Sequence, residues 1–169
     1  MSVIIGLAVC GALVGIDQLI KYSVIEYLKP IEYVDVIENV LRFRYVENSG
    51  AIFGSFSAYT TFLTIFSIIL LGLTIYFLAT NKVKSKIVNI CLLLMISGGI
   101  GNVIDRIRLK YVVDFIEPLF VNFAVFNFAD CLITVGAFAL VIYLIIDIIK
   151  DDKKNKSSVD NSENSDGTV

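Results

Sequence analysis

The chain has 169 residues, 57% of them hydrophobic, and its mean hydropathy is +0.82. A soluble core of this size could not bury so much apolar surface, so the composition indicates a membrane protein. The net charge of −2 and the scattered basic residues do not indicate a nucleic-acid partner. The sequence has no histidine, which excludes Ser-His-Asp and Cys-His catalysis, and its three separated cysteines suggest no metal, disulfide framework or cofactor.

Four apolar segments are long enough, or nearly so, to cross a hydrocarbon core as helices, which takes about 20 residues. They cover about residues 3–20, 59–79, 87–104 and 126–149. We therefore expect an α-helical integral membrane protein with one four-span domain over residues 1–150 and extracytoplasmic loops at 22–58 and 105–125. Residues 151–169 are rich in Ser, Asn, Asp and Lys, which predicts a disordered cytoplasmic tail.

Lysines predict the orientation of these spans. The link between the second and third spans carries Lys82, Lys84 and Lys86 without an acidic residue, and residues 150–156 carry four more lysines. Positive charge marks the cytoplasmic side of a membrane protein. Both termini are therefore expected in the cytoplasm, and the long first loop is expected outside.

Part of that outer loop has the pattern of a strand. Leu41, Phe43 and Tyr45 alternate with Arg42 and Arg44, a period of two that is rich in β-formers. It predicts a short strand or hairpin, a small extracytoplasmic β element at the membrane surface. The segment from 111 to 126 is apolar but interrupted by acids and a proline, so we expect it to be outer-surface chain too.

Up-and-down topology gathers the polar residues of the membrane domain into one layer. The ends of the first and third spans, the starts of the second and fourth, and the outer loops share one side. Polar groups at membrane depth are costly and mark cavities or partners. The layer contains Asp17, Asn48, Asn102, Asp105, Arg106, Asp114, Asn127 and Asp130.

Helical spacing adds detail to this layer. Gly98, Asn102 and Asp105 share one face of the third span, and the small residues around them predict a close approach of two helices. Asp17 and Lys21 are spaced as an interfacial ion pair, and we expect Asp105 to form a salt bridge with the neighbouring Arg106 that orients the site.

Asp114 and Asp130 differ from the other acids because each lies in apolar company without an adjacent cation. Two carboxyl groups that lie close together in a poorly solvated place share one proton. One can then deprotonate a water molecule while the other protonates a carbonyl oxygen or leaving amine. We therefore predict that Asp114 and Asp130 together form the acid–base pair of a hydrolase, with the residues alone leaving open which of the two carries the shared proton.

Five sequence blocks, in this order, resemble the lipoprotein signal peptidases, also called signal peptidase II. They are residues 17–22 (DQLIKY), 48–54 (NSGAIFG), 98–106 (GGIGNVIDR), 112–115 (VVDF) and 126–130 (FNFAD). The resemblance implies a bacterial inner-membrane aspartic peptidase that removes signal peptides from prolipoproteins, cutting before a diacylglyceryl-modified cysteine near the outer face. It also implies contact with membrane lipid, inhibition by globomycin-type antibiotics, and a fold of four helices with a small β-sheet and a lid-like element.

By position in these blocks, Asp114 and Asp130 resemble the family's catalytic pair. The residues that the resemblance places around them, to shape and orient the site, are Asp17, Asn48, Asn102, Asp105, Arg106 and Asn127. Gly50 and Gly54 lie in a loop where glycine allows unusual backbone angles close to a substrate.

The chain departs from the family pattern at Glu47, where arginine is common, and at Ala124, where proline is common. We assign Glu47 no role. Two other functions remain open from the residues alone: a small proton- or cation-coupled transporter that uses the buried aspartates, and a scaffold for other membrane proteins.

Overall fold

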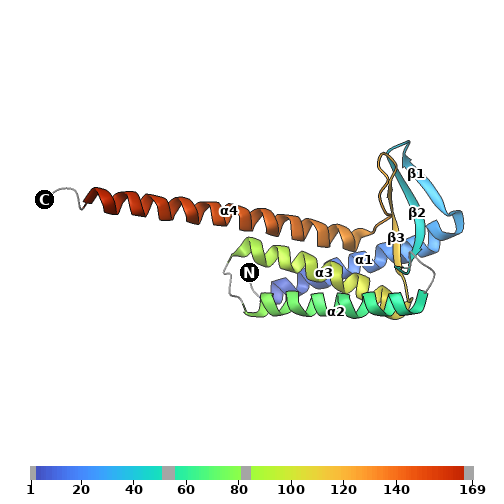
Figure 1. Ribbon diagram of the computed structural model, residues 1–169. Helices are drawn as coiled ribbons and strands as arrows, with labels where there is room; N and C mark the ends of the chain where they lie inside the picture. The colour runs from blue at the N-terminus through green and yellow to red at the C-terminus, as the bar shows by residue number, and fades with distance from the viewer. Residues whose placement is uncertain (1–2, 51–55, 81–84, 166–169) are drawn as a thin grey trace.

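The computed structural model describes residues 3–50, 56–80 and 85–165, and its main feature is a set of four long helices (Figure 1). They are α1 (Val3–Ser23), α2 (Phe56–Thr80), α3 (Lys86–Arg108) and α4 (Phe128–Ser165). Each is long and apolar enough to cross a membrane, over Ile4–Ile31, Thr60–Thr80, Lys86–Arg108 and Phe128–Lys150. The predicted four-span architecture is confirmed. Lys82 and Lys84 lie outside the described residues.

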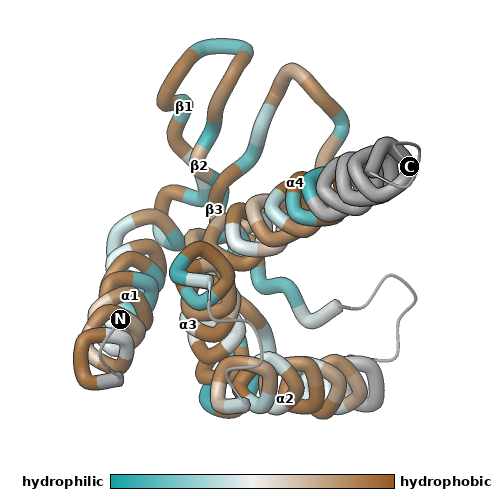
Figure 2. The backbone as a smooth tube through the Cα atoms, turned by 90° about the vertical axis from the view of Figure 1, so that its left-hand side faces the viewer, coloured by the Kyte–Doolittle hydropathy of each residue, from teal (hydrophilic) through white to brown (hydrophobic). Residues whose placement is uncertain are grey.

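The third helix is the centre of the bundle. Figure 2 shows α3 with α1, α2 and α4 around it, and 56% of its most apolar window is buried, against none of that of α2. A methyl group on Gly98 would meet the carbonyl oxygen of Ala129, and one on Gly136 would lie 2.7 Å from the carbonyl oxygen of Cys91. The predicted close approach through small residues is thus observed between α3 and α4.

A three-stranded antiparallel sheet caps one end of the bundle (Figure 1). Its order is β1 (Tyr33–Ile37), β2 (Leu41–Asn48) and β3 (Val112–Pro118), and β2 confirms the predicted strand. From the sequence we expected only outer-surface chain over residues 111–126 and did not predict β3. It is a strand because β2 supplies the partner for its backbone groups along most of its length, a long-range pairing that local sequence does not reveal.

The sheet docks on a continuation of the first helix. After α1 the chain forms a π-helix, Val24–Leu28, and a 3₁₀ helix, Lys29–Ile31. Val24 and Leu28 form an apolar cluster with Val113 and Phe115 of β3. Successive side chains of a strand point to opposite faces, so burying Val113 and Phe115 there turns Asp114 toward the other face.

The fourth helix continues past its membrane-spanning part. It ends at Ser165 and extends beyond the other three helices in Figure 1, through most of the region that its composition predicted to be disordered. Residues 166–169 lie outside the described residues. The helix can continue over residues 151–165 because extending an existing helix adds one hydrogen bond per residue and carries no nucleation cost. No proline interrupts this region.

Candidate active site

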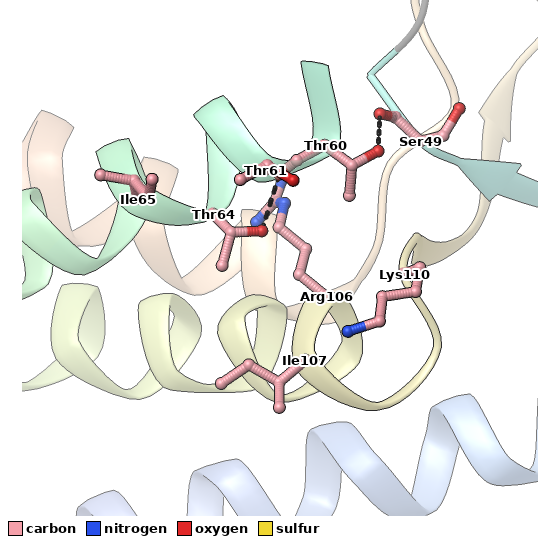
Figure 3. A pocket seen from close by; sticks show the side chains of 8 residues that line it. All are labelled: Ser49, Thr60, Thr61, Thr64, Ile65, Arg106, Ile107 and Lys110. Carbon is pink, nitrogen blue, oxygen red and sulfur yellow. Dashed lines mark hydrogen bonds between the residues drawn. The ribbon is translucent and has the colours of Figure 1, made fainter. Parts of the chain in front are cut away.

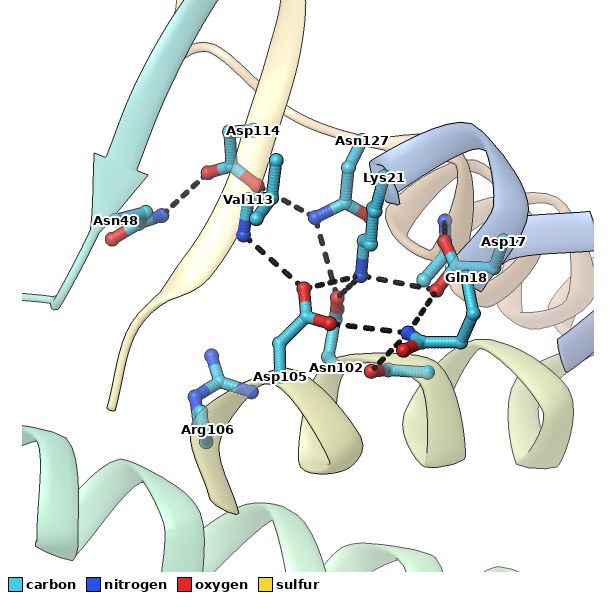
Figure 4. A network of polar contacts seen from close by, with 12 residues as sticks. Asp17, Gln18, Lys21, Asn48, Asn102, Asp105, Arg106, Val113, Asp114 and Asn127 are labelled. Carbon is cyan, nitrogen blue, oxygen red and sulfur yellow. Dashed lines mark hydrogen bonds and ion pairs between the residues drawn. The ribbon is translucent and has the colours of Figure 1, made fainter. Parts of the chain in front are cut away.

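Asp114 lies in a buried polar network at the sheet end of the bundle, between Asn48 and Asn127 (Figure 4). Its side chain is 1% exposed. The carboxyl group accepts hydrogen bonds from the Nδ2 atoms of Asn48 at 2.7 Å and Asn127 at 2.6 Å. Burial raises the pKa of Asp114 to about 6, the two amides act in the opposite direction, and the charge of Asp130 adds to the increase.

Asp130 lies in the first turn of α4, where it forms a reciprocal cap with Asn127. The Oδ1 atom of Asn127 accepts the backbone N–H of Asp130 at 3.0 Å, and Oδ2 of Asp130 accepts the backbone N–H of Asn127 at 3.2 Å. This is the capping-box arrangement, here with Asn and Asp, and a carboxylate at a helix N-terminus is electrostatically favourable. The other oxygen, Oδ1, accepts Nδ2 of Asn102 at 2.8 Å.

Asn127 joins the two acids. Its side chain donates to Asp114, its backbone donates to Asp130, and it is fully buried. Asp114 and Asp130 are called the acid pair below. The structure brings together in one network the two residues that the sequence predicted as acid and base.

A second group of buried charges lies beside the acid pair, and we call Asp17, Gln18, Lys21 and Asp105 the Lys21 cluster. Lys21 forms ion pairs with Asp17 at 3.1 Å and Asp105 at 2.9 Å. Gln18 donates to both carboxylates, at 3.2 Å and 3.1 Å. The predicted pairing of Asp17 with Lys21 is confirmed, but the pair is buried in the protein.

The predicted salt bridge between Asp105 and Arg106 is wrong, because Asp105 pairs with Lys21. Neighbouring residues of a helix point about 100° apart, so these two side chains face different partners. Arg106 lies instead within 3.5 Å of the hydroxyl of Ser67 on α2.

The carboxylates of the Lys21 cluster hold the backbone next to each member of the acid pair. Asp105 accepts the N–H of Val113 at 3.2 Å, one residue before Asp114. Asp17 accepts the N–H of Ala129 at 3.1 Å, one residue before Asp130. These bonds tie β3 to α3 and the start of α4 to α1, so the carboxylates of Asp105 and Asp17 help to fix where the two acids lie.

The side chain of Arg106 lines two cavities. One of about 260 Å³ contains both Asn102 and Asp130 in its wall, next to apolar residues of α2, α3 and α4. The other, of about 620 Å³, is lined by the hydroxyls at the start of α2 together with Arg106 and Lys110 (Figure 3). Asp130 therefore lines a space in which a substrate can lie, and Asp114 lies behind it in the buried network.

The loop after β2 approaches the site through Asn48. The Oδ1 atom of Asn48 accepts the N–H of Gly50 at 2.9 Å, which leaves its Nδ2 for Asp114. Gly50 has a φ of 74°, in the left-handed region that favours glycine. Gly54 lies outside the described residues. Glu47 forms an exposed ion pair with Lys29 at 2.9 Å, away from the acid pair.

Sequence reasoning missed the part that Lys21 and Gln18 play. Lys21 was interpreted as an interfacial partner of Asp17, yet it is 2% exposed and contacts three side chains of two helices. Its position four residues after a buried acid was the available signal. The other missed signal is the capping-box spacing of Asn127 and Asp130, which predicts their contact.

Comparisons with known proteins identify the family. A sequence profile described as signal peptidase (SPase) II matches residues 9–146. The chain belongs to the signal peptidase II family. The lipoprotein signal peptidases of Streptococcus pyogenes serotypes M5 and M18 are each 41% identical over 132 residues, which is 78% of this chain and 87% of theirs.

Solved structures show the same fold. One described as a bacterial membrane enzyme has a TM-score of 0.76 and 30% identity, and the alignment covers 86% of this chain and 90% of that one. A second with the same description has the same score and identity over 84% of this chain and 93% of that one. The protein is thus a multi-pass membrane peptidase of this family.

Among the described residues, the buried charged side chains are Asp17, Lys21, Asp105 and Asp114, and all gather at the sheet end of the bundle (Figure 4). A transporter needs polar groups through the depth of the membrane. The observed gathering at one end suits a hydrolytic site better than a conduction path.

Proposed function

We propose that Asp114 and Asp130 are the catalytic pair with which this signal peptidase removes signal peptides from prolipoproteins. The observation that carries the assignment is the bridge through Asn127, which holds both carboxyl groups in one buried network beside a cavity. The family membership supplies the reaction and the substrate class, and the network supplies the residues.

The surroundings of the two acids favour different roles. Asp114 is buried with a raised pKa, which suits the proton-bearing acid. Asp130 lies at a helix N-terminus and accepts two N–H groups, which suits the ionised base. Charge balance favours one proton on the pair: Lys21 and Arg106 supply two positive charges, whereas Asp17, Asp105, Asp114 and Asp130 supply four carboxyl groups, so a proton held by the acid pair lowers the net charge of the network.

The reaction then follows general acid–base hydrolysis. Asp130 takes a proton from a water molecule whose oxygen attacks the carbonyl carbon of the scissile bond, while Asp114 gives its proton to the carbonyl oxygen. When the C–N bond breaks, the proton on Asp130 passes to the leaving amine and Asp114 recovers a proton from a hydroxyl of the intermediate. Each acid returns to its starting state.

We propose further that the site lies near the outer face of the bacterial cell membrane and that both termini lie in the cytoplasm. Lysines at the opposite end of the bundle, including Lys86 and Lys150, support this orientation. A signal peptide that precedes a diacylglyceryl-modified cysteine is held in the bilayer, so its scissile bond lies near the membrane surface. The apolar walls of the 260 Å³ cavity suit such a lipid-bearing substrate, and globomycin-type inhibitors are expected to compete for it.

The test is conversion of a diacylglyceryl-modified prolipoprotein by purified protein in detergent. Asp114→Asn and Asp130→Asn should each abolish conversion while the protein still folds. Asp35→Asn is the matched control, because Asp35 is exposed and pairs with Arg42 on the sheet, away from the site. Normal conversion by either Asp114→Asn or Asp130→Asn would refute the assignment.

A further inference from the structure

The ammonium group of Lys21 has a hydrogen-bond acceptor for each of its three N–H donors. It is 2% exposed and its Nζ atom lies 3.1 Å from Asp17, 2.9 Å from Asp105 and 3.0 Å from Oδ1 of Asn102. A lysine ammonium has three N–H donors and no acceptor. All three donors are used, so Lys21 has none left for a substrate and does not act as a general acid.

The third contact sets the orientation of a neighbouring amide. Because the ammonium group of Lys21 only donates, the side-chain oxygen of Asn102 must face it. Nδ2 of Asn102 then faces the opposite way and donates to Asp130 at 2.8 Å. The side chain of Asn127 also donates to Oδ1 of Asn102, at 3.2 Å, while donating to Asp114 at 2.6 Å.

Without the ammonium group of Lys21, the side-chain amide of Asn102 would have a second favourable orientation. The carboxylates of Asp17 and Asp105 would lose their cation, and the amide N–H of Asn102 would be drawn toward them. Lys21 satisfies those two carboxylates and so leaves the N–H donor of Asn102 for Asp130. Figure 4 shows the ammonium group among Asp17, Asp105 and Asn102, on the side of the network away from Asn48.

We propose that Lys21 is a positioning residue for peptide hydrolysis, acting through Asn102 to keep an N–H donor on the ionised carboxylate of Asp130. The inference rests on the proposed function and adds a residue to it. Lys21 touches neither substrate nor the reacting atoms, and its effect passes along a chain of three side chains on α1, α3 and α4.

Other charged and titratable groups around Asp130 stay in place when Lys21 is changed. They are Arg106 on α3, Asp114 on β3 and the titratable thiol of Cys131 on α4, while α2 contributes no Asp, Glu, Lys or Arg. Loss of the Asn102 donor weakens the ionised form of Asp130, so the acidic limb of the pH profile of kcat should move to higher pH. A purely structural lysine would lower stability without moving that limb.

The decisive comparison is Lys21→Met against Gln18→Met. Both residues donate to Asp17 and Asp105, but only Lys21 reaches Asn102. Lys21→Met should lower kcat by about 10- to 100-fold, the usual effect of losing a hydrogen bond to a charged group, and shift the acidic limb upward. Gln18→Met should keep kcat within about twofold and leave the limb in place, even if its Tm falls.

A double-mutant cycle tests the route through Asn102. If Lys21 acts through that amide, Lys21→Met combined with Asn102→Ala should be no slower than Asn102→Ala alone. If the kcat losses of Lys21→Met and Asn102→Ala multiply in the double variant, the proposal is overturned. Should Lys21→Met not fold, Lys21→Gln serves instead, since its amide can donate to Asn102, and it should fall between wild type and Asn102→Ala in kcat.

The outcomes separate this inference from the proposed function. If Asp114→Asn and Asp130→Asn retain activity, the catalytic assignment fails. If those two variants are inactive but Lys21→Met keeps the kcat and pH profile of the parent protein, only the positioning role fails.

Discussion

The acid pair and the Lys21 cluster are neighbouring groups of buried carboxylates with different partners. Asp17 and Asp105 share the ammonium group of Lys21 and each accepts a backbone N–H group next to one member of the acid pair. Asp114 and Asp130 receive hydrogen bonds from amide N–H groups alone. Carboxyl groups without a paired cation can exchange a proton during a reaction, whereas paired ones serve structure.

The largest expected effect comes from changing one acid in each group. Asp130→Asn should lower the rate of prolipoprotein conversion by about 100- to 10 000-fold because it removes general base catalysis. Asp17→Asn should mainly lower the Tm, since it removes an ion pair and weakens the anchor on Ala129, and the remaining folded protein should keep most of its kcat. Equal losses of kcat in the two variants would contradict the division of roles.

The next effect is a pH dependence from Asp114. Its pKa is raised to about 6, so the protonated form required of the acid is lost as the pH rises through that value. We expect kcat/KM to fall by about tenfold per pH unit above about pH 6, as loss of an essential acid requires. Initial rates from about pH 5 to about pH 8 measure it. A flat profile would show that the protonated form of Asp114 is not required.

Helix packing under both groups gives a smaller effect. Gly98→Ala places a methyl group against the carbonyl oxygen of Ala129, and it should cost about 1–3 kcal/mol of stability, as overpacking usually does. Gly72→Ala on α2 is the matched control because nothing lies within 4 Å of the added methyl group. Thermal unfolding in detergent compares them. A lower Tm for both variants would show that helix interiors respond to alanine regardless of contact.

The smallest effect is expected at Glu47, where the family commonly has arginine. Its ion pair with Lys29 is about half exposed on both sides, and exposed pairs contribute little to stability. Lys29 and Tyr45 lower the pKa of Glu47, although burial partly opposes them. Glu47→Gln should therefore leave conversion within about twofold of the parent. A large loss would give this residue a role that its contacts do not suggest.

Much of the membrane fold could be predicted because its physical cause is local. Each span is a run of apolar residues, and β2 alternates from Leu41 to Tyr45 with period two. The topology then placed Asn102, Asp105 and Asp130 at one end of the bundle. The strand β3 could not be predicted in the same way, since its pairing with β2 joins residues about 70 positions apart, as Val46 with Asp114.

Composition and residue spacing are enough to predict the membrane class, the four spans and the two acids that have no cation beside them in the chain. The pairing of cations with carboxylates depends instead on how the helices pack. Asp105 precedes Arg106 in the chain but pairs with Lys21 of another helix, because helix geometry turns neighbours apart and packing brings α1 to α3. The part that Lys21 plays beside the acid pair follows from this packing, which no local pattern encodes.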